Sequence, residues 1–276
     1  MTDAAIDFDT YKRRIAFNGP VTPTLETLSR LIERHAAAIP FENIEVLARR
    51  VPLLDNASLE QKLVLHRRGG YCFEQNSFFL AALRQTGFAV NALEARVRAG
   101  VSADVVTART HMALRVTLAG DDYLADVGFG GLAPTAPFRL RVDEVQYDAV
   151  GAYRFVDVDH DLLLQCQTHE GWMDCYRIGA TQPHPIDIEM GNWFVATHPK
   201  AMLRQNLLVA RSTNGGRLTL FNNKLSLRGP AMAQPDETTL SARAEFADAL
   251  ADAFGLQIDA ADLDAVMAVI ERQAGA

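Results

Sequence analysis

Apolar residues recur every three or four positions through roughly the first third of the chain, a period that predicts amphipathic helices. Thr22 is the expected N-cap of one helix, with Pro23 at its first position. A capping box at Ser58–Gln61 is expected to begin another helix. A further helix should start at Cys72 and stop at Gly87. The recurring positions are Leu25, Leu28 and Ile32 in the first of these helices, and Asn76, Phe79, Leu80 and Leu83 in the last.

From Phe88 onward, apolar and polar residues alternate, which predicts strands with one buried face. Thr110–Val127 is typical of a hairpin with Gly120 and Asp121 at the centre of its turn. Prolines at 183 and 185 mark an expected boundary, and helical periodicity returns near the end of the chain. Along the chain, predicted helices are followed by strands and then by a mixture of both. This order predicts an α+β fold with segregated layers. Other predicted strands are 93–98, Tyr153–Val158, Leu162–Gln167 and Trp172–Ile178, with a second hairpin at Arg217–Leu227 and tail helices at Leu240–Phe254 and Leu263–Ile270.

The composition is that of an ordinary soluble globular protein, with 49% hydrophobic and 22% charged residues. The net charge of −7 argues against nucleic acid as the main partner, although a local cluster of donors could still bind an anionic cofactor. We see no signal peptide and no stretch long enough to span a membrane, so no membrane partner is expected. The three cysteines lack zinc-ligand spacing and suit a reducing compartment, which predicts a cytoplasmic protein without a metal.

Cys72 is the first candidate for chemistry. The pair Gly69-Gly70 brings it to the start of a predicted helix, where unpaired amides and the helix dipole favour a thiolate. A cysteine at a helix start is weak evidence alone, because free cysteines are mostly buried small hydrophobic residues. Cys166 and Cys175 are interpreted in that way, as ordinary strand cysteines.

A cysteine nucleophile needs a base, and the base needs an orienting group. His111 opens the first strand of the predicted hairpin and Asp126 ends the second. With the turn centred on Gly120 and Asp121, Asp126 would pair with Arg115, on the face of His111 but four residues away from it. A bulge, strong coiling or another register would have to close that gap.

Several separate motifs make the interpretation specific. Arg68–Asn76 reads Arg-Gly-Gly-Tyr-Cys-Phe-Glu-Gln-Asn, Pro40–Asn43 precedes it, and Asp126–Gly130 follows. Asn192–Phe194 and Thr197–Pro199 continue the series, and together these motifs resemble the arylamine N-acetyltransferase family. The resemblance implies a catalytic triad of Cys72, His111 and Asp126.

The resemblance also implies the architecture and the substrates. It gives an N-terminal helical domain (residues 1–87), a central antiparallel β-barrel (88–190) and a C-terminal α/β lid (191–276). Acetyl-CoA would donate the acetyl group, and an arylamine or arylhydrazine would accept it. The implied mechanism is ping-pong transfer through an acetyl-cysteine, without a metal.

Further residues are expected to contact the substrates. Phe41 and Phe129 either touch the aryl acceptor or belong to the core, and Thr110 is a further candidate beside His111. The segment at 128–131 is rich in glycine but lacks the Lys-Ser or Lys-Thr of a Walker loop. After the triad aspartate, the amides of Gly128 and Gly130 could instead meet the phosphates of the cofactor.

Two other function classes stay open. The same triad order occurs in transglutaminase-like and papain-like hydrolases, so an amidase or peptidase is one alternative. A binding protein that kept the fold but lost turnover is the other. The sequence also leaves open a homo-oligomer and the identity of the natural acceptor.

Overall fold

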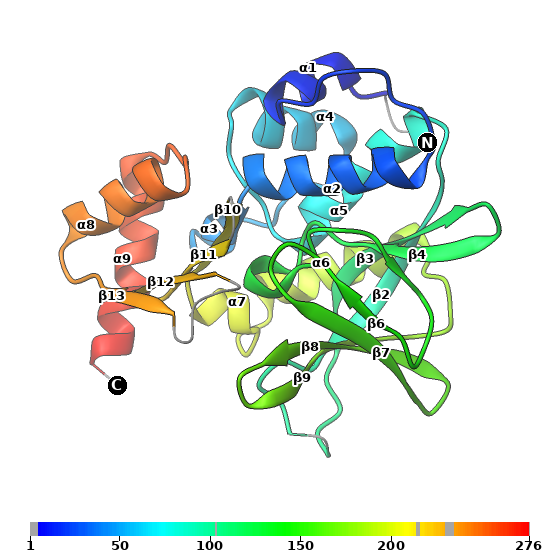
Figure 1. Ribbon diagram of the computed structural model, residues 1–276. Helices are drawn as coiled ribbons and strands as arrows, with labels where there is room; N and C mark the ends of the chain where they lie inside the picture. Colours follow the sequence, from blue (N-terminus) through cyan, green and yellow to red (C-terminus); the bar gives the residue numbers. More distant parts are fainter. Residues whose placement is uncertain (1–4, 103, 214–215, 230–234, 276) are drawn as a thin grey trace.

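The computed structural model describes residues 5–102, 104–213, 216–229 and 235–275, and it places helices above an eight-stranded sheet, with a second sheet and two helices at one side (Figure 1). The α+β fold predicted from the sequence is confirmed. None of its helices is long and apolar enough to cross a membrane, among the residues described.

The N-terminal helices begin at caps other than those predicted. Helix α2 starts after Thr24, whose side chain accepts the Thr27 N–H at 3.2 Å, so Thr22 is not the cap. Helix α4 starts after Asp55 rather than at Ser58, since the Asp55 carboxylate accepts the Ser58 N–H at 2.9 Å. Helix α5 does begin at Cys72, as predicted. The elements are α1 (Phe8–Arg14), α2 (Leu25–Ala38), β1 (Phe41–Glu42), α3 (Ile44–Leu47), α4 (Asn56–Leu59), the π-helical turn η1 (Glu60–Leu65) and α5 (Cys72–Gln85).

The central sheet is antiparallel and nearly closed, with the strand order β5-β4-β3-β2-β9-β8-β7-β6. Its two end strands meet through Gln146, whose amide bonds both the N–H and the C=O of Arg139, at 2.7 and 2.9 Å. The barrel predicted from the family resemblance is therefore present. The strands are β2 (Ala89–Val97), β3 (Arg109–Leu118), β4 (Asp121–Ala125), β5 (Phe138–Arg139), β6 (Val145–Tyr147), β7 (Ala152–Val158), β8 (Asp161–Thr168) and β9 (Gly171–Ile178), with the 3-10 turn η2 (Gly130–Leu132) after β4.

The β3–β4 register differs from the predicted one. Leu118 pairs with Asp121, so the turn is formed by Ala119 and Gly120, both with positive φ (51° and 87°). Continuing this register puts Asp126 opposite Ala113, two residues from His111 instead of four. The shorter diagonal lets the two side chains meet without a bulge in β4.

The C-terminal part begins with a helix that the sequence analysis missed. Pro185, interpreted as a boundary, is the first residue of α6. The five-stranded antiparallel sheet that follows has the order β1-β10-β11-β12-β13, so its edge strand comes from the N-terminal part of the chain. The elements are α6 (Pro185–Thr197), α7 (Met202–Gln205), β10 (Leu208–Thr213), β11 (Gly216–Phe221), β12 (Lys224–Arg228), β13 (Asp236–Thr239), α8 (Arg243–Asp248), the π-helical turn η3 (Ala249–Ala253) and α9 (Ala260–Ala274).

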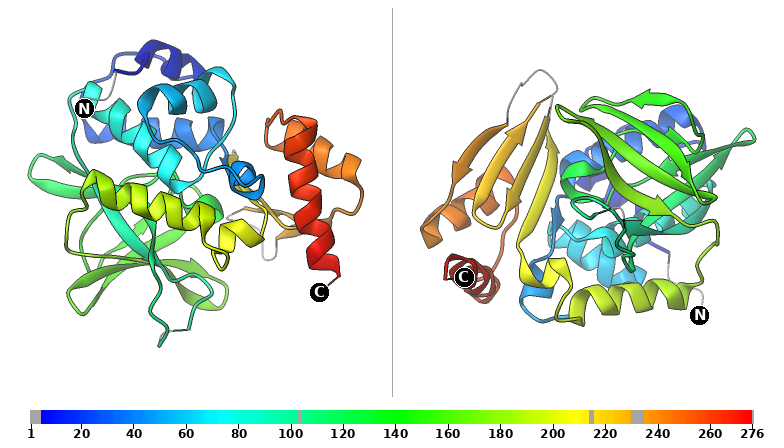
Figure 2. Two further views of the ribbon diagram at one scale, coloured as in Figure 1. Left: turned by 180° about the vertical axis from the view of Figure 1, so that it is seen from behind. Right: turned by 90° about the horizontal axis from the view of Figure 1, so that it is seen from below.

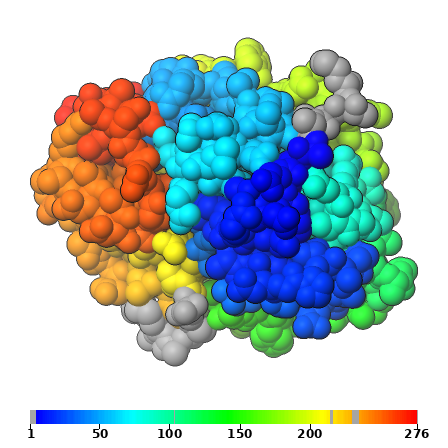
Figure 3. All heavy atoms as spheres, turned by 90° about the horizontal axis from the view of Figure 1, so that it is seen from above, coloured from blue at the N-terminus to red at the C-terminus, as the bar shows by residue number. Residues whose placement is uncertain are grey.

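The three parts pack closely. Helix α6 lies on the outside of the molecule, across the N-terminal helices and the barrel (Figure 2). Viewed from above, the C-terminal helices adjoin the segment around residues 50–70 (Figure 3). The division at 87/88 and 190/191 stays a prediction, and α6 runs without a break across residues 190 and 191.

Candidate active site

Cys72 lies at the first position of α5 and is 4% exposed. The loop before it packs tightly on the Pro40 backbone because residue 69 has no side chain: a Cβ on Gly69 would lie 2.2 Å from the Pro40 carbonyl oxygen. A Cβ on Gly128 would lie 2.8 Å from the Cα of Cys72. The missing side chains therefore let the loop before the cysteine pack on the Pro40 backbone and let the Gly128 backbone pack on Cys72 itself.

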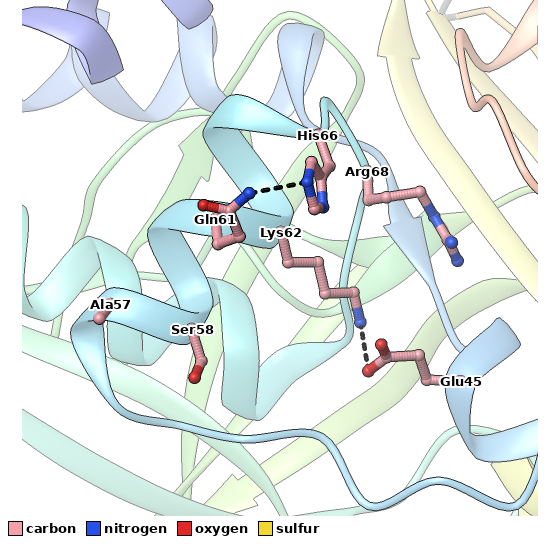
Figure 4. A pocket seen from close by; sticks show the side chains of 7 residues that line it. All are labelled: Glu45, Ala57, Ser58, Gln61, Lys62, His66 and Arg68. Carbon is pink, nitrogen blue, oxygen red and sulfur yellow. Dashed lines mark hydrogen bonds and ion pairs between the residues drawn. The ribbon is translucent and has the colours of Figure 1, made fainter.

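A network of charged side chains holds the loop before Cys72 on the side facing α4 and η1. The Glu74 carboxylate accepts the Tyr71 N–H at 3.0 Å and lies 2.5 Å from Lys62 Nζ. Burial raises the pKa of Glu74 to about 7, although Lys62 opposes this. Lys62 also bonds Glu45, and both line a groove of about 470 Å³ whose other walls are Ala57, Ser58, Gln61, His66 and Arg68 (Figure 4).

Arg68 connects the same loop to the C-terminal part. Its guanidinium lies 3.0 Å from Glu42 and 2.8 Å from Asp262, which is on α9. The Glu42 side chain is fully buried, and that of Arg68 is 15% exposed. Arg68 therefore fixes the cysteine loop in place and is not part of a solvated face.

His111 and Asp126 are brought together as predicted. His111 Nε2 lies 2.8 Å from Asp126 Oδ2, and both side chains are buried. This bond leaves Nδ1 of the ring for Cys72, whose Sγ lies 3.7 Å from the Thr110 carbonyl. Burial disfavours the charged imidazole, but the carboxylate of Asp126 and the hydrogen bond to Cys72 outweigh it and raise the pKa of His111 to about 10.

Asp126 accepts four hydrogen bonds. Besides His111, the donors are Tyr176 Oη at 2.8 Å, Asn76 Nδ2 at 3.0 Å and the Gly128 N–H at 2.9 Å. Burial raises the pKa of Asp126, but the charge of His111 and the hydrogen bonds from His111, Asn76 and Gly128 more than offset it and keep the pKa below its usual value. The carboxylate is therefore held ionised and fixed in direction.

Tyr176 is a member of the site that the sequence analysis missed. Its ring packs on His111 at a centroid distance of 4.6 Å while its hydroxyl bonds Asp126. It lies on β9, where a bulge opposite Leu164 and Gln165 turns both Cys175 and Tyr176 inward. Strand β9 pairs with β2 and not with β3 or β4, so Tyr176 reaches His111 and Asp126 from at least two strands away, and no local sequence signal marks it.

Of the predicted substrate-contacting residues, Phe129 and Thr110 lie beside the triad, whereas Phe41 and Gly130 line a small cavity. Phe129 is half-buried and its ring packs on His111 at 4.8 Å and on Tyr176 at 4.6 Å. Thr110 is half-buried beside the sulfur. Phe41 is 6% exposed, and Phe41 and Gly130 line a small cavity of about 20 Å³ between α2, η2 and β10.

Gly128 has a different environment from the expected one. Its N–H is bound to Asp126 and its Cα faces the Cys72 backbone, which argues against a contact between this amide and phosphate. Gly130, with φ of +63°, stays a candidate for that contact.

Comparison with known proteins agrees with this geometry. A family model described as N-acetyltransferase matches residues 24–263. Arylamine N-acetyltransferase of Escherichia coli (strain K12) is 40% identical over 255 residues, which cover 90% of this chain and 88% of that protein. The chain belongs to the arylamine N-acetyltransferase family. It is an acetyltransferase, as the motifs predicted.

Other members of the family extend the agreement. The Salmonella typhimurium protein named arylamine N-acetyltransferase / N-hydroxyarylamine O-acetyltransferase is 43% identical over 203 residues, or 72% of this chain and 71% of that protein. The solved structure of Mycobacterium marinum arylamine N-acetyltransferase in complex with CoA is 35% identical with a TM-score of 0.89, and the match covers 96% of this chain and 99% of that one.

Proposed function

We propose that the chain transfers an acetyl group from acetyl-CoA to the nitrogen of an arylamine or arylhydrazine by a ping-pong mechanism through acetyl-Cys72. One observation carries the proposal: a cysteine at a helix start is hydrogen-bonded to a buried histidine, and a ring nitrogen of that histidine is bonded to a buried carboxylate. The names of the relatives and the CoA complex of the Mycobacterium marinum protein support the two substrates.

In the first half-reaction, the Cys72 sulfur attacks the thioester carbonyl. A pKa of about 10 means that His111 carries a proton at neutral pH, and this proton goes to the departing CoA sulfur. The N–H groups of the first turn of α5 have no partners within the helix, so the Cys72 amide is a candidate donor to the oxyanion.

In the second half-reaction, the amine nitrogen attacks the thioester formed on Cys72. His111, now neutral, accepts the proton that the amine loses, and the Cys72 sulfur leaves. Asp126 keeps Nε2 of His111 bonded throughout, so Nδ1 faces the reacting atoms in both steps.

Ionisation of the cysteine is a small part of the catalysis. A free thiol is a few per cent ionised at neutral pH, so full ionisation gains roughly thirtyfold, or about 2 kcal/mol. Enzymes typically need several times that reduction of the barrier. The remainder must come from the position of the sulfur and from oxyanion donors.

The test is the intact mass of the protein after incubation with acetyl-CoA, with and without an arylamine. We expect one added acetyl group that the amine removes, and no added group in Cys72→Ser. An alkoxide is far harder to form than a thiolate at neutral pH, so this variant should lose transfer while its melting curve stays unchanged. Full activity in Cys72→Ser would remove Cys72 from the nucleophile role. Turnover of amides without an acetyl-enzyme would favour the amidase alternative.

A further inference from the structure

The peptide bond between Gly70 and Tyr71, one residue before the peptide that enters Cys72, is held at both its polar atoms by side chains of α5. Its N–H donates to Glu74, as described above, and its carbonyl oxygen accepts from Gln75 Nε2 at 2.7 Å. The Glu42 N–H also donates to this carbonyl, at 3.1 Å. With this peptide fixed, only the φ and ψ of the fully buried Tyr71 separate it from the peptide that enters Cys72.

Gln75 is the end of a buried chain of hydrogen bonds that starts at Tyr11. Tyr11 Oη lies 2.8 Å from His35 Nδ1, and His35 Nε2 lies 3.0 Å from Gln75 Oε1. All three side chains are fully buried. They come from α1, α2 and α5, so the hydrogen bonds link three helices of the N-terminal layer.

Only one arrangement of protons satisfies this chain. The Gly70 carbonyl can only accept, so Gln75 must turn its NH₂ towards it and its oxygen towards His35. His35 must then carry its proton on Nε2, and Nδ1 accepts from the Tyr11 hydroxyl. Burial lowers the pKa of His35 to about 3 and raises the pKa of Tyr11, so both groups stay neutral around neutral pH. Every donor therefore points towards Gly70.

We propose that Tyr11, His35 and Gln75 are positioning residues that orient the Gly70–Tyr71 peptide and thereby aim the Cys72 sulfur at His111. The proposal rests on the proposed role of Cys72 as the nucleophile. None of the three touches the reacting atoms. Their effect is on the rate of the step in which Cys72 acts, beyond their effect on stability.

The decisive variants remove polar atoms but keep volume. Tyr11→Phe deletes one hydroxyl, and Gln75→Met deletes both ends of the amide. Phe78→Leu is the matched control, because Phe78 packs on the Tyr11 ring at 5.2 Å, lies fully buried on α5 and has no polar atom in the chain. Each is measured for single-turnover acetylation, for alkylation of Cys72 by iodoacetamide located by peptide mass, and for its melting temperature.

We expect Gln75→Met to slow both reactions of Cys72 by roughly ten- to a hundredfold, the range for a small misplacement of a reacting group. Tyr11→Phe should slow them less, and should add nothing in the Gln75→Met background, where the chain is already broken. Phe78→Leu should lower the melting temperature and leave both rates unchanged.

Wild-type rates in Tyr11→Phe and Gln75→Met, with only a lowered melting temperature, would overturn the proposal and make the chain purely structural. If Gln75→Met does not fold, Tyr11→Phe decides alone, because its ring and packing are kept. Alkylation needs no acetyl-CoA, so this result is independent of the proposed acetyl transfer, which the Cys72→Ser variant tests.

Discussion

Each polar residue of the segment Cys72–Asn76 holds a different part of the site. Glu74 and Gln75 hold the N–H and the C=O of the Gly70–Tyr71 peptide. Asn76 reaches the other way, donating to Asp126 and to the Met112 carbonyl at 3.0 and 2.7 Å. Phe73 is the apolar exception and is fully buried. One helical turn thus aligns the nucleophile with its own loop and with the carboxylate that orients His111.

Gly128 is expected to tolerate no side chain. A Cβ there would lie 2.7 Å from Asn76 Nδ2 and 2.8 Å from the Cα of Cys72, so Gly128→Ala must displace one of them. We expect a loss of about 1–3 kcal/mol of unfolding free energy, the usual cost of overpacking, together with a large loss of Cys72 acetylation. Gly151→Ala is the control, because a Cβ there meets nothing within 4 Å. Equal behaviour of the two variants in denaturant unfolding and single-turnover assays would contradict the close approach.

Phe129 is expected to affect the two half-reactions unequally. An aryl acceptor stacked on its ring would gain about 0.5–1.5 kcal/mol beyond burial, so Phe129→Ala should weaken transfer to flat aromatic amines by roughly tenfold or more. Acetylation of Cys72 should change much less, because the acetyl group has no ring. Arylamine turnover and single-turnover acetylation are measured on the same variant.

Phe138→Ala provides the comparison for a core role. Phe138 is 2% exposed in the same barrel core that Phe129 packs against. Its truncation should cost about 3–5 kcal/mol of stability and reduce both half-reactions alike. If Phe129→Ala behaves in this way, Phe129 belongs to the core and the acceptor must bind elsewhere.

At the scale of elements, sequence patterns correctly located those elements whose formation depends mainly on neighbouring residues. The glycine pair and the helical period located the start of α5, and alternation located β3 and β4. The predicted β3–β4 register was wrong because the turn was centred on Gly120 and Asp121. In the structure Ala119, a residue other than glycine, adopts a left-handed φ of 51° and forms the turn with Gly120. Asp126 and His111 were still assigned to the correct face, since a shift of two residues preserves parity.

Helix α6 was missed for a different reason. Its exposed face carries apolar residues, with Ile186, Met190 and Trp193 all about 60% exposed, so its sequence shows no polar side to reveal the period. Its buried face holds Gly191 and Asn192. A Cβ on Gly191 would lie 2.6 Å from the Phe73 ring, and Asn192 bonds the Pro52 carbonyl at 3.0 Å. These contacts come from distant parts of the chain and leave no local pattern.

The packing of α1, α2 and α5 around His35 gives a pH-dependent stability. The folded protein keeps His35 neutral down to a pKa of about 3, whereas the unfolded chain binds a proton near 6.5. The contribution is therefore complete above pH 6.5 and is lost as the pH falls towards 3. Between pH 6.5 and 5 the wild type should lose roughly 1.5 kcal/mol of unfolding free energy from this group.

His35→Gln should remove this contribution, so the unfolding free energy of wild type minus that of His35→Gln should fall by roughly 1.5 kcal/mol between pH 6.5 and 5. Urea unfolding of both proteins at several pH values between 5 and 6.5 measures this difference. Glu74, whose pKa is raised to about 7, takes up a proton over the same range, but it does so in both proteins and cancels in the difference. His169→Gln is the control, because it also removes a histidine, but one whose side chain is 65% exposed. Parallel slopes in wild type and His35→Gln would show that His35 does not titrate on unfolding.

At the scale of the whole molecule, the cysteine loop and the C-terminal helix are joined through Asp262. This residue bonds Arg68 of the loop at 2.8 Å and Arg50 after α3 at 2.5 Å. The edge strand β1, which carries Phe41, also extends the C-terminal sheet. The C-terminal part is therefore built onto the N-terminal layer behind the nucleophile.

Asp262→Asn tests how much this connection contributes to the free energy of unfolding and to the acetylation rate of Cys72. The Asp262 side chain is 2% exposed, and its loss leaves the largely buried Arg68 with only Glu42 as an ionic partner. Removing one member of a buried ion pair costs about 3–5 kcal/mol of unfolding free energy. The lower end applies here because Arg68 keeps Glu42 and Arg50 is half-exposed.

Asp264→Asn on the same helix is the control. It also loses an arginine partner, Arg243 at 2.5 Å, but the Asp264 side chain is 69% exposed. Its cost should therefore stay below about 1 kcal/mol. Denaturant unfolding compares the two, and Cys72 acetylation should slow only in Asp262→Asn, because only that substitution loosens Arg68 and the loop before the cysteine. Similar unfolding free energies and equal acetylation rates in both variants would mean that α9 packs on the N-terminal layer without constraining the nucleophile.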